Sequence, residues 1–301
     1  MRQRLNNVAK QQHRPTAELL QYFAMERFLY RLAQSPHRDR FVLKGAMMLV
    51  AWRVPVIRPT MDIDLLGRGR NQTTELVEVV RELCRMDVAP PDGLVFAPES
   101  VVGEQITVES EYVGVRLRFL ATLGTARVRM QIDVGFGDAV LDAEQDIELP
   151  TILDFPAPRL TGYSRETAIA EKLNAMFQHG RLNSRMKDYL DIGLLARHFA
   201  FDGDRLRRAI EVTFARRGTA LDPDPIGLRD EFAKEPGKQV QWAAFLRKIR
   251  AADAKEELLE QIGALRAFLG PALAAMVSGE LFTDHWPMGG PWSAVTPAPT
   301  P

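Results

Sequence analysis

Hydrophobic and polar residues alternate along residues 113–136, with a break at a Gly-Thr pair. The apolar positions of the two runs are Val113, Val115, Leu117, Phe119, Val128, Met130, Ile132, Val134 and Phe136. Arginine, glutamine, aspartate and glycine fill most positions between them. Because successive side chains of a strand point to opposite faces, this pattern predicts two half-buried strands. The short link containing Gly124 joins them as a hairpin.

Beyond residue 158 the hydrophobic period lengthens from about 2 to about 3.6 residues, which is typical of amphipathic helices. The segment from Ile147 to Pro158 that precedes this change is rich in proline. We therefore place a domain boundary there. Helices are predicted over residues 164–180, 184–199, 203–216, 226–234, 239–252 and 255–277.

The first half of the chain mixes helical and strand patterns. A helix is predicted from Thr16 to about Ser35, because Thr16 can cap its start and Pro36 follows its end. The remaining predictions are a buried run at residues 41–43, a helix at 46–52, a strand at 61–66, a helix at 73–86 and a loop at 89–98. The chain thus divides into an N-terminal basic leader and helix (1–36), a mixed core (37–158), a helical C-terminal domain (159–284) and a disordered tail rich in proline and glycine (285–301).

The overall charge says nothing about partners, since 39 basic residues balance 39 acidic ones. Cys84 is the single cysteine, which excludes an internal disulfide framework and a cysteine-based zinc site. No secretory signal pattern and no apolar run of about 18 residues is present. We therefore expect a cytoplasmic protein that does not enter a membrane.

Asp62 and Asp64 flank Ile63 within an otherwise apolar segment. In a strand the two carboxylates share one face, and paired oxygen ligands of this kind suit Mg²⁺. A solvent-facing strand edge with two solubilising aspartates is the alternative. Asp133 lies on the polar face of the second hairpin strand and is the candidate for a third carboxylate. Bridging carboxylates of this kind hold the metal ions of two-metal phosphoryl chemistry.

Lys44 and Gly45 stand directly before the helix predicted to begin at Ala46. Backbone N–H groups at such a turn can receive a triphosphate. The turn precedes Asp62 by only seventeen residues.

Two charged residues fall on apolar helix faces in the C-terminal half. Lys172 lies within the arc that contains Ile169, Leu173 and Met176, and Asp188 shares a face with Ile192. A lysine on an inward face must extend to solvent or meet an anion such as a nucleotide phosphate. A structural Lys172–Asp188 salt bridge is the alternative. Basic residues further along, such as Arg207 and Arg217, form clusters that suit an RNA backbone or a solvated surface.

The ordered set of motifs resembles the AbiEii/AbiGii toxin family of nucleotidyltransferases, which includes the mycobacterial MenT toxins. The motifs are LKGAMMLVAW (43–52), RPTMDIDLLG (58–67), QIDVGFGD (131–138), ETAIAEKLNAM (166–176) and RMKDYLDIGLL (185–195). The resemblance implies an α+β fold with a polymerase-β-like nucleotidyltransferase core, a small mixed sheet flanked by helices, and a helical C-terminal domain. It also implies transfer of nucleotides from an NTP to RNA, the 3′ end of tRNA foremost, which blocks translation.

The resemblance further assigns roles to individual residues. It implies that Asp62, Asp64 and Asp133 bind Mg²⁺, with Mn²⁺ as the alternative ion. Lys172 matches the lysine that contacts the nucleotide, and Asp188 matches the aspartate of the K-D-x-x-D motif. The turn Lys44-Gly45-Ala46 would bind the nucleotide phosphates, and an AbiEi-type antitoxin would be the cognate partner.

The chain departs from the family pattern at the phosphate turn. The family has Gly-Gly or Gly-Ser there, often beside a hydroxyl, whereas this chain has Gly45-Ala46-Met47. No hydroxyl stands at this place to bind phosphate or to be modified by an antitoxin. Two alternatives to RNA transfer remain open: nucleotidyl transfer to a protein or a small molecule, and a catalytically silent binding protein.

Overall fold

A computed structural model describes residues 1–301 except 56–58, 109–111, 250–256 and 295–301. Contacts between Cα atoms divide the chain into two compact units. Unit 1 comprises residues 1–138 and 143–163, and unit 2 comprises residues 139–142 and 164–301. The change of unit at Tyr163 and Ser164 differs from the expected boundary at residue 158, and the N-terminal leader and helix belong to unit 1.

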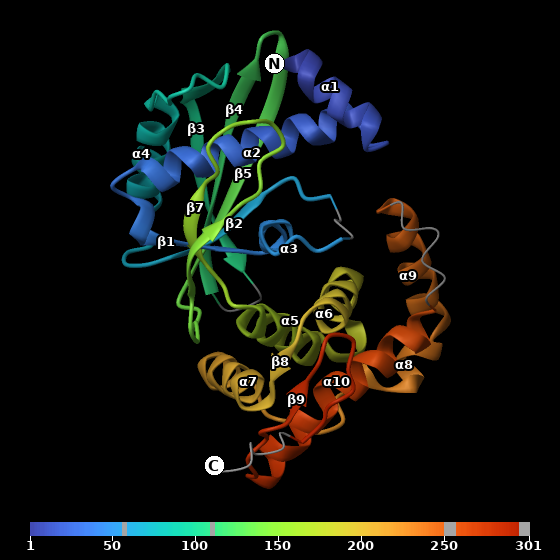
Figure 1. Cartoon of the computed structure of the whole chain (residues 1–301). Coiled ribbons are helices and arrows are strands. Elements are labelled where there is room, and N and C mark those ends of the chain that lie inside the picture. The colour runs from blue at the N-terminus through green and yellow to red at the C-terminus, as the bar shows by residue number, and fades with distance from the viewer. Residues whose placement is uncertain (56–58, 109–111, 250–256, 295–301) are drawn as a thin grey trace, which may run out of the picture. The chain divides into compact units, whose positions relative to one another are not determined.

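A seven-stranded sheet forms the centre of unit 1 (Figure 1). Its strands are β1 (Phe41–Lys44), β2 (Ile63–Gly67), β3 (Leu94–Val108), β4 (Tyr112–Leu123), β5 (Ala126–Phe136), β6 (Glu144–Glu148) and β7 (Arg159–Gly162). The helices of the unit are α1 (Arg2–Gln11), α2 (Thr16–Gln34), η1 (Arg38–Arg40), α3 (Ala46–Ala51) and α4 (Thr73–Arg85).

The sheet is mixed, with the strand order β3-β4-β5-β2-β1-β7-β6. The predicted hairpin of β4 and β5 is confirmed, and β3 extends it with a further antiparallel strand. β2 runs parallel to β5 and antiparallel to β1, while β1 runs parallel to β7. The expected fold class, a mixed sheet flanked by helices, is therefore correct.

One face of the sheet carries the apolar residues of the alternating strands. Ile63 and Leu65 of β2 lie there with Val115 and Leu117 of β4, in one core that includes residues of α2 and α4 such as Phe28. Figure 1 shows α2 crossing the strands. The alternating pattern leaves the intervening polar residues on the opposite face, which is where the site is built.

A loop was predicted over residues 89–98, and this is wrong from Leu94 onward, where β3 begins. Proline and glycine depress the strand signal there, but the pairing with β4 shifts its register between Ala97 and Val102. Pro98 lies inside this irregularity, where a missing N–H costs no ladder hydrogen bond. Ser100 holds the bulge, because its hydroxyl donates to the Ala97 carbonyl and accepts from the Leu120 N–H.

Unit 2 is mainly helical, as predicted. Its elements are α5 (Arg165–His179), η2 (Gly180–Leu182), α6 (Met186–His198), β8 (Phe201–Asp202), α7 (Gly203–Arg217), η3 (Ile226–Leu228), α8 (Asp230–Lys234), α9 (Pro236–Lys248), α10 (Leu258–Ser278) and β9 (His285–Trp286). Residues 250–252 of one predicted helix and 255–256 of another lie outside the described residues.

The predicted disordered tail is partly ordered. His285 and Trp286 form β9 and pair with β8, and the Trp286 and Trp292 rings pack against Phe268. Aromatic burial therefore overrides the local abundance of proline and glycine. The last seven residues of the predicted tail lie outside the described part of the chain.

Helix α10 is long and apolar enough to cross a membrane by length and composition, the one such helix among the described residues. Its Ile262, Leu265 and Phe268 side chains are buried within the protein. The core helix of a folded domain can have the same length and apolar composition. The charged residues Glu260 and Arg266 lie within α10 and interrupt its series of apolar residues, which is why the sequence shows no uninterrupted apolar run.

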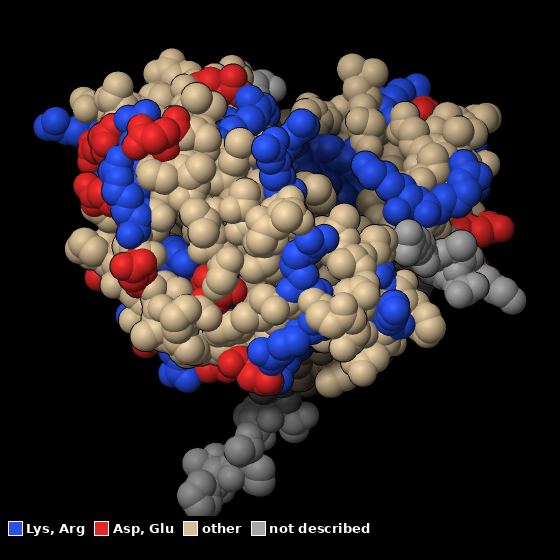
Figure 2. All heavy atoms as spheres, turned by 90° about the horizontal axis from the view of Figure 1, so that it is seen from above, with Lys and Arg blue, Asp and Glu red and all other residues tan. Residues whose placement is uncertain are grey.

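Basic and acidic side chains occur together on the face shown in Figure 2. This agrees with the equal numbers of basic and acidic residues in the sequence. Any attraction of a polyanion must therefore arise from local groups rather than from net charge.

Candidate functional site

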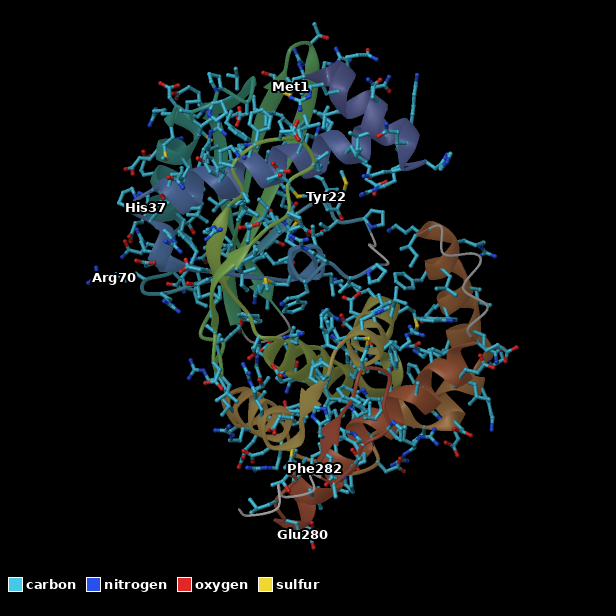
Figure 3. All side chains as sticks on the ribbon, viewed as in Figure 1. Met1, Tyr22, His37, Arg70, Glu280 and Phe282 are labelled. Atoms are coloured by element: carbon cyan, nitrogen blue, oxygen red, sulfur yellow. The ribbon has the colours of Figure 1, made fainter. Side chains whose placement is uncertain are left out.

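Helix α2 positions the segment that leads into β2. The Tyr22 hydroxyl, on a residue labelled in Figure 3, accepts a hydrogen bond from the Thr60 N–H at 3.2 Å. The buried Gln21 amide donates to the carbonyls of Met61 and Arg129, each at 3.2 Å. These bonds join the start of β2 to the middle of β5, so the acidic residues that follow Met61 have a fixed register against β5.

A row of charged residues crosses five strands on the polar face of the sheet. The register pairs Lys44 with Asp64, Asp64 with Asp133, Asp133 with Arg116, and Arg116 with Glu104. Directly paired residues of neighbouring strands project from the same face. The row therefore concentrates carboxylates at its centre and places a basic residue on either side.

The three predicted metal ligands converge. Each of Asp62, Asp64 and Asp133 offers a carboxylate oxygen, and these atoms all lie within 4.8 Å of one another. Asp62 stands just before β2 rather than within it, and the Thr60 hydroxyl donates to its Oδ1 at 2.6 Å. All three residues are partly exposed, so a ligand can reach them.

Arg116 donates two hydrogen bonds to the third carboxylate of the triad, Asp133. Its Nε and Nη2 donate to the two oxygens of Asp133 at 2.8 and 2.7 Å. Hydrogen bonding to Asp133 raises the pKa of Arg116 above its usual range. A cation that uses an oxygen of Asp133 must therefore compete with this guanidinium.

The glycine turn packs directly on Asp64. Gly45 has φ +71°, and a Cβ at this residue would lie 2.0 Å from the Asp64 Oδ2. Only glycine meets both the backbone conformation and this close approach. Ala46 begins α3 and is buried, so a larger side chain is not accommodated there without a shift.

Lys44 has a buried partner that the sequence did not indicate. Its Nζ lies 2.6 Å from the Asp138 Oδ2, and the Tyr163 hydroxyl donates to the same oxygen at 2.8 Å. A Cβ at Gly135 would lie 3.1 Å from the Lys44 Nζ. The ammonium group is therefore held at the edge of the charged row, and Asp138 anchors it.

Lys172 and Asp188 belong to unit 2 and lie together there. The Lys172 Nζ is 2.7 Å from Asp191 and 3.4 Å from Asp188, and both carboxylates are fully buried. Arg185 also donates to Asp188, at 2.6 Å. The anticipated ion pair thus exists, with Asp191 as the nearer partner.

Sequence reasoning missed four of these participants: Arg116, Asp138, Tyr163 and Asp191. The position of Arg116 opposite Asp133 follows from the hairpin register, since a link through Gly124 and Thr125 sets Leu123 against Ala126. Counting back along both strands would have identified the pair. Asp138 and Tyr163 are far apart in sequence, and no local pattern indicates their contact.

The donor set fits a hard divalent cation. Three carboxylates on adjacent backbone segments supply oxygen ligands, which Mg²⁺ prefers, and their mutual repulsion is relieved by a positive charge between them. The glycine turn beside Asp64 brings backbone groups close to the three carboxylates, so one ligand can contact both the turn and a cation held by the carboxylates.

Comparison with known proteins agrees with this geometry. Residues 27–268 match the family model described as "Nucleotidyl transferase AbiEii toxin, Type IV TA system". The structure is similar to MenT4, the nucleotidyltransferase toxin Rv2826c of Mycobacterium tuberculosis, with 21% identity and a TM-score of 0.51, over 90% of this chain and 98% of that one. It is also similar to JHP933 of Helicobacter pylori, with 15% identity and a TM-score of 0.46, over 84% of this chain and 92% of that one. No curated protein matches the chain.

The family match covers most of the chain and includes the acidic triad, the glycine turn, Lys172 and Asp188. The chain therefore belongs to the AbiEii family of nucleotidyltransferase toxins of type IV toxin–antitoxin systems.

Proposed function

We propose that this toxin transfers a nucleotidyl group from an NTP to an RNA hydroxyl, the 3′ end of tRNA foremost, in a reaction that depends on Mg²⁺. In this reaction the acceptor oxygen forms a bond to the α-phosphorus of the NTP. The bond between that phosphorus and the bridging oxygen breaks, pyrophosphate leaves, and the proton of the acceptor hydroxyl passes to solvent. Addition at the 3′ end of tRNA would block translation.

Asp62, Asp64 and Asp133 would hold the metal ion. Mg²⁺ bound there would supply positive charge to the phosphoryl oxygens as the acceptor attacks and pyrophosphate leaves. The N–H groups of the Gly45-Ala46 turn and the Lys44 ammonium would bind the phosphates beside it. The observation that carries the proposal is the convergence of the three carboxylates with a glycine turn packed on Asp64.

The proposal is tested by incubating the protein with Mg²⁺, each labelled NTP in turn, and total tRNA. We expect label to enter RNA with at least one NTP, and Asp64→Asn to abolish it. Asp154→Asn is the matched control, since Asp154 is an exposed residue far along the chain from the triad and pairs with Arg4. Transfer that is equal in wild type and Asp64→Asn would contradict the proposal.

The same incubation with an aminoglycoside or a protein added beside the tRNA covers the other acceptors. Label found in protein or in an aminoglycoside, and absent from RNA, would assign the same chemistry to a different substrate. A thermal shift with Mg²⁺ and NTP measures substrate binding independently of the acceptor. Binding to the native state alone stabilises it by about 2.7 kcal/mol at a hundredfold excess over Kd.

Lys172 receives its proposed role, contact with the nucleotide, from the family motif, and Asp188 matches the aspartate of the K-D-x-x-D motif. An AbiEi-type antitoxin is the proposed partner, and the cytoplasm is the proposed compartment. If expression of the wild-type protein arrests growth, co-expression with an AbiEi-type antitoxin should relieve the arrest.

A further inference from the structure

A pocket of about 490 Å³ lies on the polar face of the sheet, beside the acidic triad. Its lining includes Met61, Val102, Leu120, Arg118, Arg129 and Gln131. Met61 immediately precedes Asp62, and Gln131 and Arg118 are two residues along β5 and β4 from Asp133 and Arg116, on the same face. Since a strand rises about 3.4 Å per residue, the pocket begins about 7 Å from the triad.

The pocket exposes apolar side chains where a solvated sheet face would carry polar ones. Met61 is 60% exposed, Val102 is 62% exposed and Leu120 is 40% exposed, although the opposite face of the same strands is completely buried. In an antiparallel sheet with one solvated face, polar residues are expected on that face. The three apolar residues are therefore an unpartnered surface rather than part of the core.

The same surface is basic. Arg129 is exposed and forms no ion pair with any residue that the structure describes. Arg118 donates to Glu104 at 2.6 Å and to Gln131 at 3.4 Å, at the surface. Apolar side chains and guanidinium planes stack against the faces of unpaired bases, while arginine also neutralises phosphates. The chemistry fits a single-stranded nucleic acid.

Strand order indicates which substrate approaches from this side. Lys44 ends β1 and the glycine turn follows it, on one side of the β2–β5 triad. The pocket is formed on β5, β4 and β3, on the other side. In phosphoryl transfer the attacking and leaving oxygens are roughly in line with the phosphorus. If the leaving pyrophosphate lies toward β1, the acceptor hydroxyl must enter from β4.

We propose that this pocket, formed on β3, β4 and β5 with Met61 at its edge, binds the single-stranded end of the acceptor RNA. The inference rests on the proposed function and adds the position of its second substrate. Bases pack on Met61, Val102 and Leu120, and Arg129 contacts the backbone phosphate. Stacked nucleotides rise about 3.4 Å each, so the length of strand from Asp133 to Arg129 accommodates more than one.

The test measures fluorescence anisotropy of a labelled single-stranded RNA octamer and of tRNA, without NTP, across a salt series. We expect Arg129→Gln to weaken binding about tenfold, as expected for loss of a charged hydrogen bond. The slope of log K against log salt should fall by about 0.7, the value for one phosphate contact on a single strand. Met61→Asp and Val102→Asp should weaken binding about tenfold by placing a carboxylate against the bases.

Two matched controls lie elsewhere. Arg85→Gln changes an exposed arginine of α4, which packs against the opposite, apolar side of the sheet, and Val240→Asp changes an exposed valine of α9. Both should bind RNA as wild type does. All five variants should keep the thermal shift with Mg²⁺ and NTP, because the triad and the glycine turn are unchanged.

The outcomes separate the two proposals. Wild-type transfer to RNA, together with normal RNA binding by the three pocket variants, would overturn the pocket assignment and leave the proposed function standing. Absence of any transfer to RNA by the wild type would overturn the proposed function, and the pocket assignment with it. Pocket variants that bind RNA normally but lose the antitoxin would assign this surface to a protein partner instead.

Discussion

Gly45 shows how one residue can connect a turn with the acidic triad. Its φ of +71° favours glycine, and a Cβ would overlap the Asp64 carboxylate. The sequence marked Gly45 as the start of a phosphate turn. Its contact with Asp64 gives it a second role, which is to let the carboxylate lie against the backbone.

We predict that Gly45→Ala abolishes nucleotide transfer and the Mg²⁺-dependent thermal shift, because the methyl group displaces Asp64. Gly218→Ala is the matched control, with a similar φ of +62° and no atom within 4 Å of its Cβ. It should cost about 1 kcal/mol of stability from backbone strain and leave transfer intact. Equal activity in both variants would contradict the role of the Asp64 contact.

Glu26 is a buried acid on α2. Its Oε2 accepts a hydrogen bond from the Ile152 N–H at 2.8 Å, and it lies 3.7 Å from Arg27. Burial raises the pKa of Glu26 to about 7, from an ordinary value of 4.5. The folded state therefore binds a proton that the unfolded state releases between these two pH values.

The sign follows from this difference in proton binding. The stabilising contribution is fully present below pH 4.5 and is lost as the pH rises through about 7. We predict that Glu26→Gln removes this decline, on the order of 2–3 kcal/mol, because the amide stays neutral and still accepts from Ile152. Urea denaturation at pH 5 and pH 8 measures it. The exposed Glu99→Gln should keep the wild-type dependence; a Glu26→Gln variant that also keeps it would refute the prediction.

At the scale of elements, the hairpin of β4 and β5 organises the site. The alternation of apolar and polar residues in the sequence predicted this hairpin, and its register sets Arg116 opposite Asp133. Arg116 offsets part of the repulsion among three carboxylates that lie within 4.8 Å of one another. A bound cation would provide the same compensation.

We predict that Arg116→Ala lowers stability in EDTA by about 1 kcal/mol, as expected for a partly exposed bidentate pair. The loss of stability relative to wild type should be smaller in saturating Mg²⁺. The bound ion replaces the positive charge of Arg116, and in the variant it no longer competes with the guanidinium for Asp133. Arg159→Ala is the matched control, since Arg159 forms a cross-strand pair with Glu148 at 2.7 Å between β7 and β6. Arg159→Ala should lose the same amount of stability in EDTA and in Mg²⁺. An Mg²⁺-independent deficit for Arg116→Ala would count against the prediction.

At the scale of the whole molecule, each unit has its own buried residues. The core of unit 1 lies between the sheet and helices α2 and α4. Unit 2 buries helix faces together with Asp188 and Asp191, which pair with the partly buried Lys172. Removing one partner of a buried ion pair leaves an uncompensated charge and typically costs about 3 kcal/mol or more.

We predict that Lys172→Met lowers the free energy of unfolding by about 3 kcal/mol or more, measured by calorimetry. We also expect the variant to lose nucleotide transfer at temperatures where it is folded. Lys234→Met removes a surface pair with Asp230 in the same unit, and it should change stability by less than about 0.5 kcal/mol. If folded Lys172→Met transfers normally, the lysine is structural and its proposed contact with the nucleotide is wrong.

The sequence by itself determined the elements with strong periodicity and the residues of the acidic triad. The alternation of β4 and β5 and the helical pattern of unit 2 are local properties, because each repeat reflects which face of one element is buried. The ordered motifs likewise indicated the family. Asp62 and Asp64 were paired by their spacing alone.

Tertiary structure decided what depends on contacts between distant segments. The joining of Asp133 to the Asp62 and Asp64 pair required the parallel pairing of β5 with β2. The Asp138 contact with Lys44, the bulge that admits Pro98 into β3 and the packing of Trp286 on Phe268 are likewise absent from any local pattern. Sequence periodicity reports which face of an element is buried, whereas register and strand order fix which residues meet on that face.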